Sequence, residues 1–309
     1  MGSWDGPADT ADLSIGLSVR GLTKRFGDLT AVSDVTFDIH AGGVTGFLGP
    51  KGVGKSTTFG MILGLVEPDS GTALIQGLPY RALPQPAAVV GAALETPGIN
   101  PRFTGRSHLR VRAAASGISD DRVDEVLELV GLTAAADRRT GSYSLGMSQR
   151  LGLGAALLGH PGLLILDEPA NGLDPEGIKW LREFLRDFAA RDNAVLVSSH
   201  QIAEMEVLAD DVVVIHRGRL IRHAPVGELL DRDAALLVET SAPDRLSHWL
   251  MEEGMEIERT GLQSLVVRGG SARRIGELAL AAGVPLHGLA SEQTRLEAVF
   301  LELTREENL

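Results

Sequence analysis

The chain lacks cysteine, long apolar runs and an excess of basic residues. With no cysteine among its 309 residues, it can form neither disulfides nor cysteine-ligated metal sites. Lysine and arginine total 29 against 41 aspartates and glutamates, so the formal net charge is −12. A protein that binds nucleic acid needs a basic footprint on its surface. We therefore expect no nucleic-acid partner.

No stretch of the sequence is long and apolar enough to predict a membrane span. The longest nearly apolar run, Leu151 to Leu166, is too short and is interrupted by His160 and Pro161. Residues 1–16 show no basic start followed by an apolar core, and they predict a flexible tail rather than a signal peptide. If the protein works at a membrane, we expect another subunit to span it.

What the chain does contain is a glycine-rich segment between a predicted strand and a predicted helix. Val44 to Leu48 is a short apolar run typical of a buried strand, and residues 56–65 carry apolar side chains at helical spacing. Residues 49–56 between them fit the pattern G-x-x-x-x-G-K-[ST] of a phosphate-binding loop. The loop and the residue after it are Gly49, Pro50, Lys51, Gly52, Val53, Gly54, Lys55, Ser56 and Thr57.

The residue types in this loop suit a triphosphate. Glycines let the backbone wrap around the phosphates and direct several N–H groups at them. The helix that follows adds the positive end of its dipole. Lys55 can reach the β- and γ-phosphates, and the Ser56 hydroxyl can ligate Mg²⁺. A glycine turn that matches by chance is the weaker alternative, because the flanking elements come in the required order.

Short apolar strands alternate with helices over residues 17–232, which predicts an α/β domain with a largely parallel sheet. Ligands of such sheets bind at the carboxyl ends of the strands. Several polar or small residues come directly after apolar strands and can converge on one site. These residues are Gly49, Glu95, Asp167, Glu168 and His200.

The pair Asp167 and Glu168 follows an apolar strand and suits a hydrolytic site. We expect Asp167 to hold Mg²⁺, directly or through water, and Glu168 to polarise the attacking water. His200 could contact the γ-phosphate, although a histidine at a strand end is more often structural. Phe26 could stack on an adenine face or could be an ordinary core residue, and the sequence leaves both interpretations open.

Two further regions of the first domain are predicted to be helical. Residues from about 102 to 136 predict helices, and the clearest one runs from Asp120 to Val130, capped by Ser119 and ended by Gly131. A turn of small residues then leads into a predicted helix over residues 149–158.

Residues 233–309 predict a separate small α+β domain. The elements follow the order β-α-β-β-α-β, which is ferredoxin-like, and a last helix is predicted over residues 294–303. This part carries no evident site chemistry, so its default interpretation is a packing or interaction module. The six elements are predicted at residues 235–239, 243–253, 256–259, 264–267, 272–282 and 285–289.

The segment Ser144-Leu145-Gly146-Met147-Ser148-Gln149-Arg150 lies a short helix before Leu163-Leu164-Ile165-Leu166-Asp167-Glu168-Pro169. It resembles the signature of the ATP-binding subunit of ABC transporters, usually written L-S-G-G-Q, with departures at Tyr143, Leu145 and Met147. The resemblance covers about Leu17 to Arg232. It implies an ABC-type P-loop NTPase fold with a helical subdomain at about residues 97–140, which touches a membrane partner.

The resemblance also implies roles for single residues. Phe26 corresponds to the A-loop aromatic, Asn171 to Asp174 to the D-loop, and His200 to the switch histidine. Members of this family pack head to tail, so that one subunit's phosphate loop and the other's signature hold ATP between them. Ser144 and Gly146 keep the signature positions that reach phosphate, and the implied activity is Mg²⁺-dependent ATP hydrolysis by a dimer.

Departures from the family pattern indicate which branch of the family the chain resembles. Glu95 stands where most members have the Q-loop glutamine, and we expect it near the nucleotide and Mg²⁺. Lys51 and Val53 fall at variable positions of the phosphate loop, so nucleotide binding should survive. Together with the small C-terminal domain, Glu95 and the signature resemble the bacitracin and lantibiotic immunity branch of efflux ATPases. That branch implies a motor subunit peripheral to the cytoplasmic face of the membrane, exporting an antibiotic peptide or drug through a separate permease.

The same residues bear on other classes of protein. A ribosome-acting ABC protein would carry two ATPase units in tandem, and a DNA-repair type would carry long coiled-coil inserts, neither of which is present. A P-loop GTPase would need an N-K-x-D motif, and a generic kinase would leave the signature stretch unexplained. An importer ATPase stays open, because this subunit does not encode the direction of transport. The sequence does not name the cargo.

Overall fold

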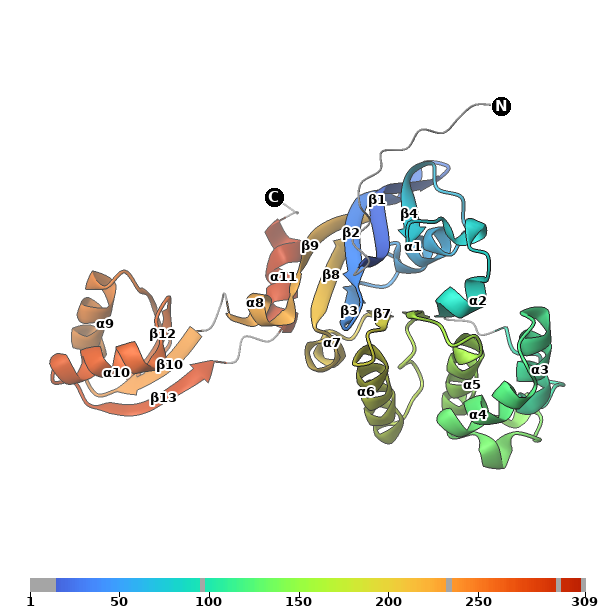
Figure 1. Ribbon diagram of the computed structural model, residues 1–309. Helices are drawn as coiled ribbons and strands as arrows, with labels where there is room; N and C mark the ends of the chain where they lie inside the picture. The colour runs from blue at the N-terminus through green and yellow to red at the C-terminus, as the bar shows by residue number, and fades with distance from the viewer. Residues whose placement is uncertain (1–14, 95–97, 232–234, 293–295, 307–309) are drawn as a thin grey trace. The chain divides into compact units, whose positions relative to one another are not determined.

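The computed structural model describes residues 15–94, 98–231, 235–292 and 296–306 of the chain. The chain divides into two compact units, Met1–His223 and Ala224–Leu309, and Figure 1 shows the elements of each. The predicted tail over residues 1–16 lies outside the described residues up to residue 14. The predicted boundary between residues 232 and 233 lies outside them as well.

Two sheets build the first unit. One is antiparallel with strand order β2-β1-β4. The other has the order β5-β6-β7-β3-β8-β9, and its pairs from β5 to β8 are parallel, as the alternation of apolar strands and helices predicts. The strands are β1 Ile15–Phe26, β2 Leu29–His40, β3 Val44–Leu48, β4 Ser70–Ile75, β5 Val90–Ala93, β6 Leu163–Asp167, β7 Ala194–Ser199, β8 Asp211–His216 and β9 Arg219–Pro225.

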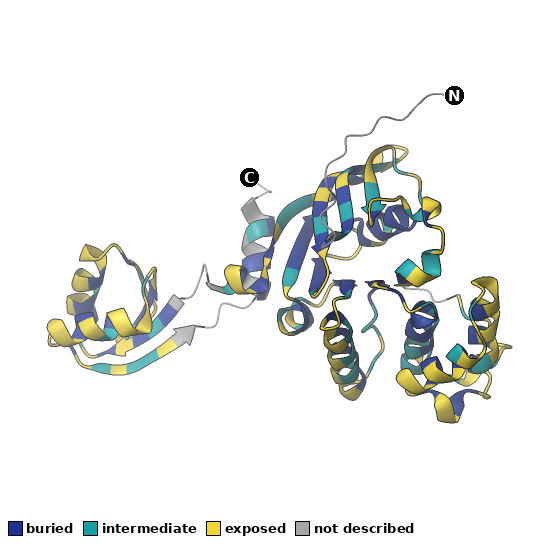
Figure 2. Cartoon of the chain, in the orientation of Figure 1, coloured by how far each residue is buried: buried dark blue, intermediate teal, exposed yellow. Residues whose placement is uncertain are grey.

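A single apolar core joins the two sheets. Phe37 of the antiparallel sheet lies 5.6 Å from Phe47 of the central strand β3, measured between ring centroids. Phe47 lies 5.4 Å from Phe59 on the helix that follows the glycine-rich loop. Every residue of β3, β6 and β7 is buried, and Figure 2 colours β3 dark blue, as buried. The loop at the end of β3 is therefore held by a rigid support.

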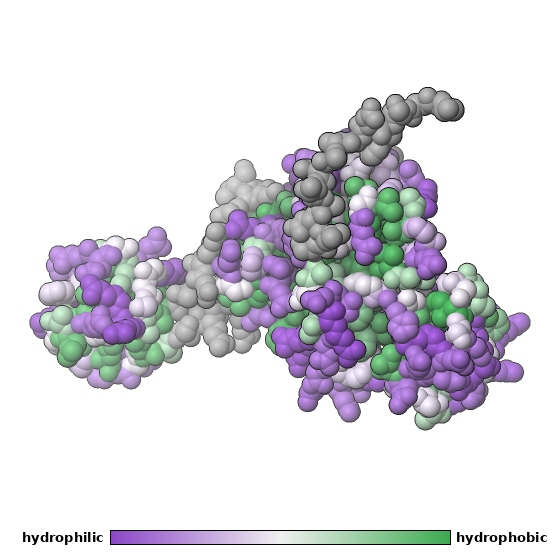
Figure 3. Space-filling view, in the orientation of Figure 1, coloured by the Kyte–Doolittle hydropathy of each residue, from purple (hydrophilic) through white to green (hydrophobic). Residues whose placement is uncertain are grey.

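Helices surround this core, and most of the predicted ones are present. The clearest predicted helix is α4, which buries Val123, Val126 and Leu127 on one face. Figure 3 shows a largely hydrophilic surface over α4 and α6. The helices of the first unit are α1 Lys55–Ile62, α2 Pro86–Val89, α3 Gly105–Ala115, α4 Asp121–Leu129, α5 Leu145–Leu157, α6 Pro175–Ala189 and α7 Ile202–Leu208.

The start of α5 differs from the prediction. The sequence predicted a helix from residue 149, preceded by a turn of small residues, but α5 begins at Leu145. The Ser144 hydroxyl accepts a hydrogen bond from the Met147 N–H at 3.2 Å, and this N-cap starts the helix one turn earlier. The signature-like segment therefore belongs to the helix, with Ser144 at its tip.

The second unit contains a four-stranded antiparallel sheet with strand order β11-β12-β10-β13. The elements that form this sheet and pack on it follow the predicted order β-α-β-β-α-β. Their core includes Val238, Leu246, Leu250, Val267 and Ile275. The elements are α8 Val226–Asp231, β10 Ala235–Thr240, α9 Pro243–Glu252, β11 Glu256–Arg259, β12 Ser264–Arg268, α10 Ala272–Ala281, β13 Leu286–Glu292 and α11 Leu296–Glu306.

The length and hydropathy of the helices decide whether any of them could cross a membrane. Within the described ranges, none of them has the length and apolar character needed to cross a membrane.

Candidate nucleotide-hydrolysing site

The glycine-rich loop connects the end of β3 to the start of α1. Two of its glycines are required by close backbone contacts. A Cβ on Gly49 would lie 2.6 Å from the Ile215 carbonyl oxygen, and one on Gly54 would lie 2.3 Å from that of Ala31. Gly54 also has a φ of 107°, a conformation that side chains disfavour. Glycine at these two positions thus lets the loop fold tightly against its neighbours.

The loop offers free hydrogen-bond donors. In the part of the chain that the structure describes, no protein acceptor takes the backbone N–H groups of Lys51, Gly52, Val53 or Gly54. The helix α1 starts at Lys55, directly after them. Successive free N–H groups at a helix N-terminus form an anion site. The loop therefore fits the phosphates of a nucleotide, which supply the bond that is hydrolysed.

Lys55 is buried at the centre of this loop. Its Nζ donates hydrogen bonds to the carbonyl oxygens of Gly49, at 2.8 Å, and Pro50, at 3.2 Å. The same Nζ lies 3.3 Å from Glu168 Oε1, and both side chains are buried, with 7% and 11% of their surface exposed. A buried ammonium needs such partners. The contact brings together two residues that the sequence had placed at one site.

Asp167 and Glu168 stand at the end of β6, next to the end of β7. Ser198 of β7 links them, because its hydroxyl donates to Asp167 Oδ1 at 2.5 Å and accepts from the Glu168 N–H at 2.9 Å. Glu168 adopts a φ of 52°, in the left-handed region. Its side chain points at Lys55, so the strained backbone conformation directs the carboxylate into the site.

His200 completes the group from the end of β7. Its Nδ1 lies 2.8 Å from Glu168 Oε2, while 46% of its side chain is exposed. The contact fixes the orientation of the ring and leaves its other edge accessible. Glu168 is thereby held from two sides, by Lys55 at one carboxylate oxygen and by His200 at the other.

This arrangement can perform hydrolysis of a phosphoanhydride. A carboxylate at the position of Glu168 can accept a proton from water, and Lys55 can stabilise charge on the phosphates. Asp167 and the Ser56 hydroxyl are the oxygen ligands that would hold Mg²⁺, since a buried carboxylate at 3% exposure calls for a cation partner. In the described ranges no group of three or more histidine, aspartate and glutamate side chains is placed to hold a metal ion.

The predicted signature residues lie on α5 and contact the D-loop of the same chain. A Cβ on Gly172 would lie 2.0 Å from Leu145 Cδ2, and Gly172 has a φ of 78°. A Cβ on Gly146 would lie 3.3 Å from Leu173 Cδ2. Asp174 caps α6, where its Oδ1 accepts from the Gly177 N–H at 2.9 Å. Ser144, Gly146 and Asp174 therefore gather at the adjoining starts of α5 and α6, and no described bond joins them to Lys55.

Two predicted site residues stand apart from this group. Phe26, at the end of β1, is 50% exposed, so it is not the ordinary core residue that the sequence left as one alternative. Its ring lies 5.6 Å from Lys24 Nζ, and its stacking role stays a prediction. Glu95, which was expected near the nucleotide and Mg²⁺, lies outside the described residues.

Sequence reasoning missed two residues at this site. Ser198 closes an apolar run that begins at Ala194, and a polar residue two positions before His200 was the available signal. No sequence pattern singles out Glu204 on α7. Burial raises its pKa, and the charges of His200 and Glu168 act on it as well. It lies in the first turn of α7, four residues after His200.

The loop, the paired acids and the histidine define a P-loop ATPase site, and the comparisons with known proteins say which class it belongs to. A family model described as ABC transporter matches residues 32–171, and a model described as a domain of unknown function matches residues 234–297. The chain is 35% identical to a bacitracin transport ATP-binding protein of Bacillus licheniformis, over 91% of this chain and 95% of that protein. The chain belongs to the ABC transporter family of ATP-binding proteins.

Other relatives agree with this assignment. A lantibiotic transport ATP-binding protein of Streptococcus pyogenes is 35% identical, over 66% of this chain and 89% of that protein. A solved ATP-binding subunit of an ABC transporter is 27% identical, with a TM-score of 0.63, over 86% of this chain and 99% of the other. The chain is thus the ATP-binding, ATP-hydrolysing subunit of an ABC transporter.

Proposed function

We propose that this subunit drives export of an antibiotic peptide or a similar drug through a separately encoded permease. The observation that carries the cargo class is the similarity to a bacitracin transport ATP-binding protein over nearly the full length of both chains. That similarity extends through the second unit, which the general ABC transporter match does not cover. The lantibiotic relative points to the same kind of cargo.

The proposal assigns the chemistry to the group around Glu168. ATP binds with its phosphates on the loop from Gly49 to Thr57, and Mg²⁺ is held by Ser56 and Asp167. Glu168 accepts the proton of the attacking water, with His200 fixing its orientation. The arrangement supports this proposal because Lys55 and His200 already hold both oxygens of Glu168.

The proposal also assigns an assembly. Two ATPase subunits pack head to tail, and Ser144 and Gly146 of one subunit complete the nucleotide site of the other. Ser144 supports this role because it is exposed at the tip of α5. The dimer docks on the cytoplasmic face of the permease and is peripheral to the membrane, which agrees with the lack of a membrane-crossing helix among the described residues.

The test of hydrolysis is the variant Glu168→Gln. It keeps the shape of the side chain and removes the base, so ATP turnover should fall by roughly 100-fold to 10,000-fold. Turnover is measured as phosphate release by the purified chain. Glu176→Gln, which changes an exposed glutamate of α6, is the matched control and should retain the rate of the unaltered chain. Equal rates for the two variants would remove Glu168 from the reaction.

The test of export is resistance. A sensitive bacterial host expressing this chain together with its candidate permease should tolerate more bacitracin than a host expressing the permease with Glu168→Gln. Accumulation of labelled peptide should fall in the same cells. A rise in uptake driven by ATP would instead establish an importer. Unchanged resistance and unchanged uptake across a panel of peptide antibiotics would contradict the proposed cargo class.

A further inference from the structure

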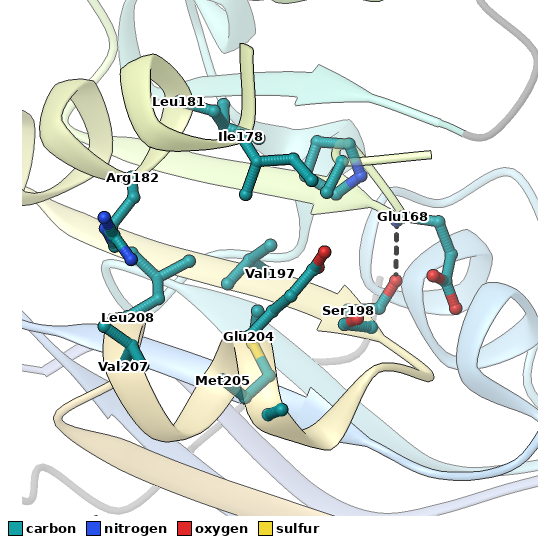
Figure 4. A pocket seen from close by; sticks show the side chains of 14 residues that line it. Glu168, Ile178, Leu181, Arg182, Val197, Ser198, Glu204, Met205, Val207 and Leu208 are labelled. Atoms are coloured by element: carbon teal, nitrogen blue, oxygen red, sulfur yellow. Dashed lines mark hydrogen bonds between the residues drawn. The ribbon is translucent and has the colours of Figure 1, made fainter. Parts of the chain in front are cut away.

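A cavity of about 210 Å³ lies behind Glu168, between the helices α6 and α7. The residues that follow β6 and the end of β7 also line it, and Figure 4 shows the side chains around it. Most of its wall is apolar. The apolar wall includes Ile178, Leu181, Val197, Met205 and Leu208.

The carboxyl group of Glu204 points into this cavity (Figure 4). Its Oε2 is shut off from solvent and has no hydrogen-bond partner among the described residues. Buried polar oxygens nearly always have a partner, and an exception calls for an explanation. A hydrogen-bond donor in the cavity could become that partner once the carboxyl group rotates toward it.

The size and lining of the cavity restrict what can supply the donor. An apolar protein cavity of roughly 150 Å³ holds a benzene molecule, so a space of about 210 Å³ admits a ring or a branched alkyl group with one substituent. The apolar wall favours a carbon body, and the Glu204 carboxylate favours a cationic donor. Arg182 lines the cavity too, and its guanidinium lies on the side away from the Glu204 carboxyl group in Figure 4.

We propose that this cavity binds a small organic amine, with its apolar body between α6 and α7 and its ammonium group on Glu204. Glu204 is the anchor, and Arg182 disfavours a cation at the opposite end. The ammonium donates to the carboxylate after a small rotation of the carboxyl group, and no covalent step is involved.

We expect occupancy of the cavity to regulate hydrolysis, a role that rests on the proposed function. Glu168 and Ser198 form part of the wall, and Ser198 holds the backbone N–H of Glu168. The carboxylate of Glu204 is already coupled electrostatically to Glu168 and His200. An ammonium on Glu204 would change the field at both residues, and we expect slower turnover.

The test measures binding of benzylammonium to the full chain by titration calorimetry without nucleotide, at pH 8. Glu204→Gln should weaken binding about tenfold or more, because a charge-assisted hydrogen bond becomes a neutral one. Arg182→Gln should strengthen it, since the repelling charge is gone. Ile178→Phe, which adds bulk to the wall and leaves Glu204 intact, should block it. Glu176→Gln is the matched control and should bind as the unaltered chain does.

The pH dependence gives a second readout. Burial raises the pKa of Glu204, so affinity should increase as pH rises through the ionisation of this carboxyl group while the amine stays protonated. The other charged or titratable groups facing the cavity or coupled to Glu204 are Glu168, His200 and Arg182. The rise should therefore persist in His200→Gln and Glu168→Gln and disappear in Glu204→Gln.

Several outcomes would overturn the proposal. Equal affinity of the unaltered chain and Glu204→Gln would do so, provided thermal unfolding shows both to be folded. Tighter binding of benzoate than of benzylammonium would make Arg182 the anchor and reverse the ligand class. Phosphate release is measured separately. Binding without any change in turnover would leave the amine site standing and refute its regulatory role, whereas an inactive chain that binds the amine would count against the proposed hydrolysis alone.

Discussion

Lys55 and Glu168 are two charged residues that the fold buries against each other. Their charged atoms are 3.3 Å apart, and Glu168 has a second partner in His200. A buried ion pair contributes little net stability, but removing one partner leaves the other charge without compensation. A phosphate bound at the loop would share the ammonium of Lys55 with Glu168.

The contribution of each of these two residues to the free energy of unfolding therefore depends on the other. Lys55→Ala should abolish ATP binding and should also lower the free energy of unfolding by roughly 3 kcal/mol, because Glu168 stays buried without its ammonium. Adding Glu168→Gln to Lys55→Ala should recover part of that loss. Chemical denaturation of the four chains in a double-mutant cycle measures the coupling. Additive effects would mean that the two charges do not interact in solution.

Single residues show clearly where the sequence predicts the site and where it does not. Lys55, Asp167 and Glu168 were predictable because each occupies a fixed place in a pattern next to an apolar strand. Ser198 was not, because its role depends on β6 and β7 being neighbours and in register, with Asp167 opposite Ser198. Strand order is a property of the whole sheet, which local spacing does not contain.

At the scale of elements, α5 and α6 meet where the predicted signature touches the D-loop. Leu145 stands where the family signature has a glycine, and it fills the space above Gly172. On the next turns of the two helices, Arg150 lies over the Trp180 ring, 4.2 Å from its centroid. The side chain of Leu145 in the predicted signature thus lies where Gly172 of the predicted D-loop has no side chain.

Gly172→Ala tests this pairing. The new Cβ would overlap Leu145, and the φ of 78° adds strain of about 1 kcal/mol. We expect a loss of both thermal stability and ATP turnover. Leu145→Ala should have little effect alone, because 60% of Leu145 is exposed, and in combination it should restore the steric part of the loss. A double variant no better than Gly172→Ala would show that the backbone strain acts alone.

The helix α3 carries a buried histidine whose effect depends on pH. Burial lowers the pKa of His108, the positive charge of Arg112 lowers it further, and the residue is 5% exposed. The unfolded chain therefore binds a proton at His108 more readily than the folded chain, and stability is lost as pH falls below about 6.5. Melting temperatures at pH 7.5 and 5.5 should differ by more in the unaltered chain than in His108→Leu. His287→Leu, at an exposed position of β13, should keep the full difference.

Elements differ in how far the sequence could predict them. The buried strands were predicted because β3 and β6 are apolar except for Thr45 and for Asp167 at the site. The start of α5 was misplaced because glycine and serine at 146 and 148 are poor helix formers, and the Ser144 cap outweighs them. The short helix α2 ahead of β5 was also missed, since four residues are too few to show periodicity.

For the whole molecule, the chain provides two compact units with separate cores. The first carries every described residue of the proposed hydrolytic site. The second was predictable in element order, because its strands and helices are short and well separated by turns. Its contribution to function was not predictable, since no group of polar residues in it follows a known chemical pattern.

The proposed head-to-tail dimer places Ser144 of one subunit at the phosphates held by the other. Binding of ATP should therefore join two chains, and hydrolysis should separate them. We expect Glu168→Gln to bind ATP without hydrolysing it, so this variant should elute as a dimer on size exclusion with ATP and Mg²⁺, and as a monomer with neither. A chelator should prevent the shift, because Mg²⁺ offsets the charge of the triphosphate.

The double variant Glu168→Gln with Ser144→Arg separates this interface from any other. Arginine at the tip of α5 is too long for the space that serine leaves at a phosphate, and the double variant should stay monomeric with ATP. Arginine at Ser142, also exposed just before α5, is the matched control for added charge and should leave the dimer intact. A dimer that forms without ATP and ignores Ser144 would place the contact elsewhere, and residues 235–306 would then be the part of the chain to delete next.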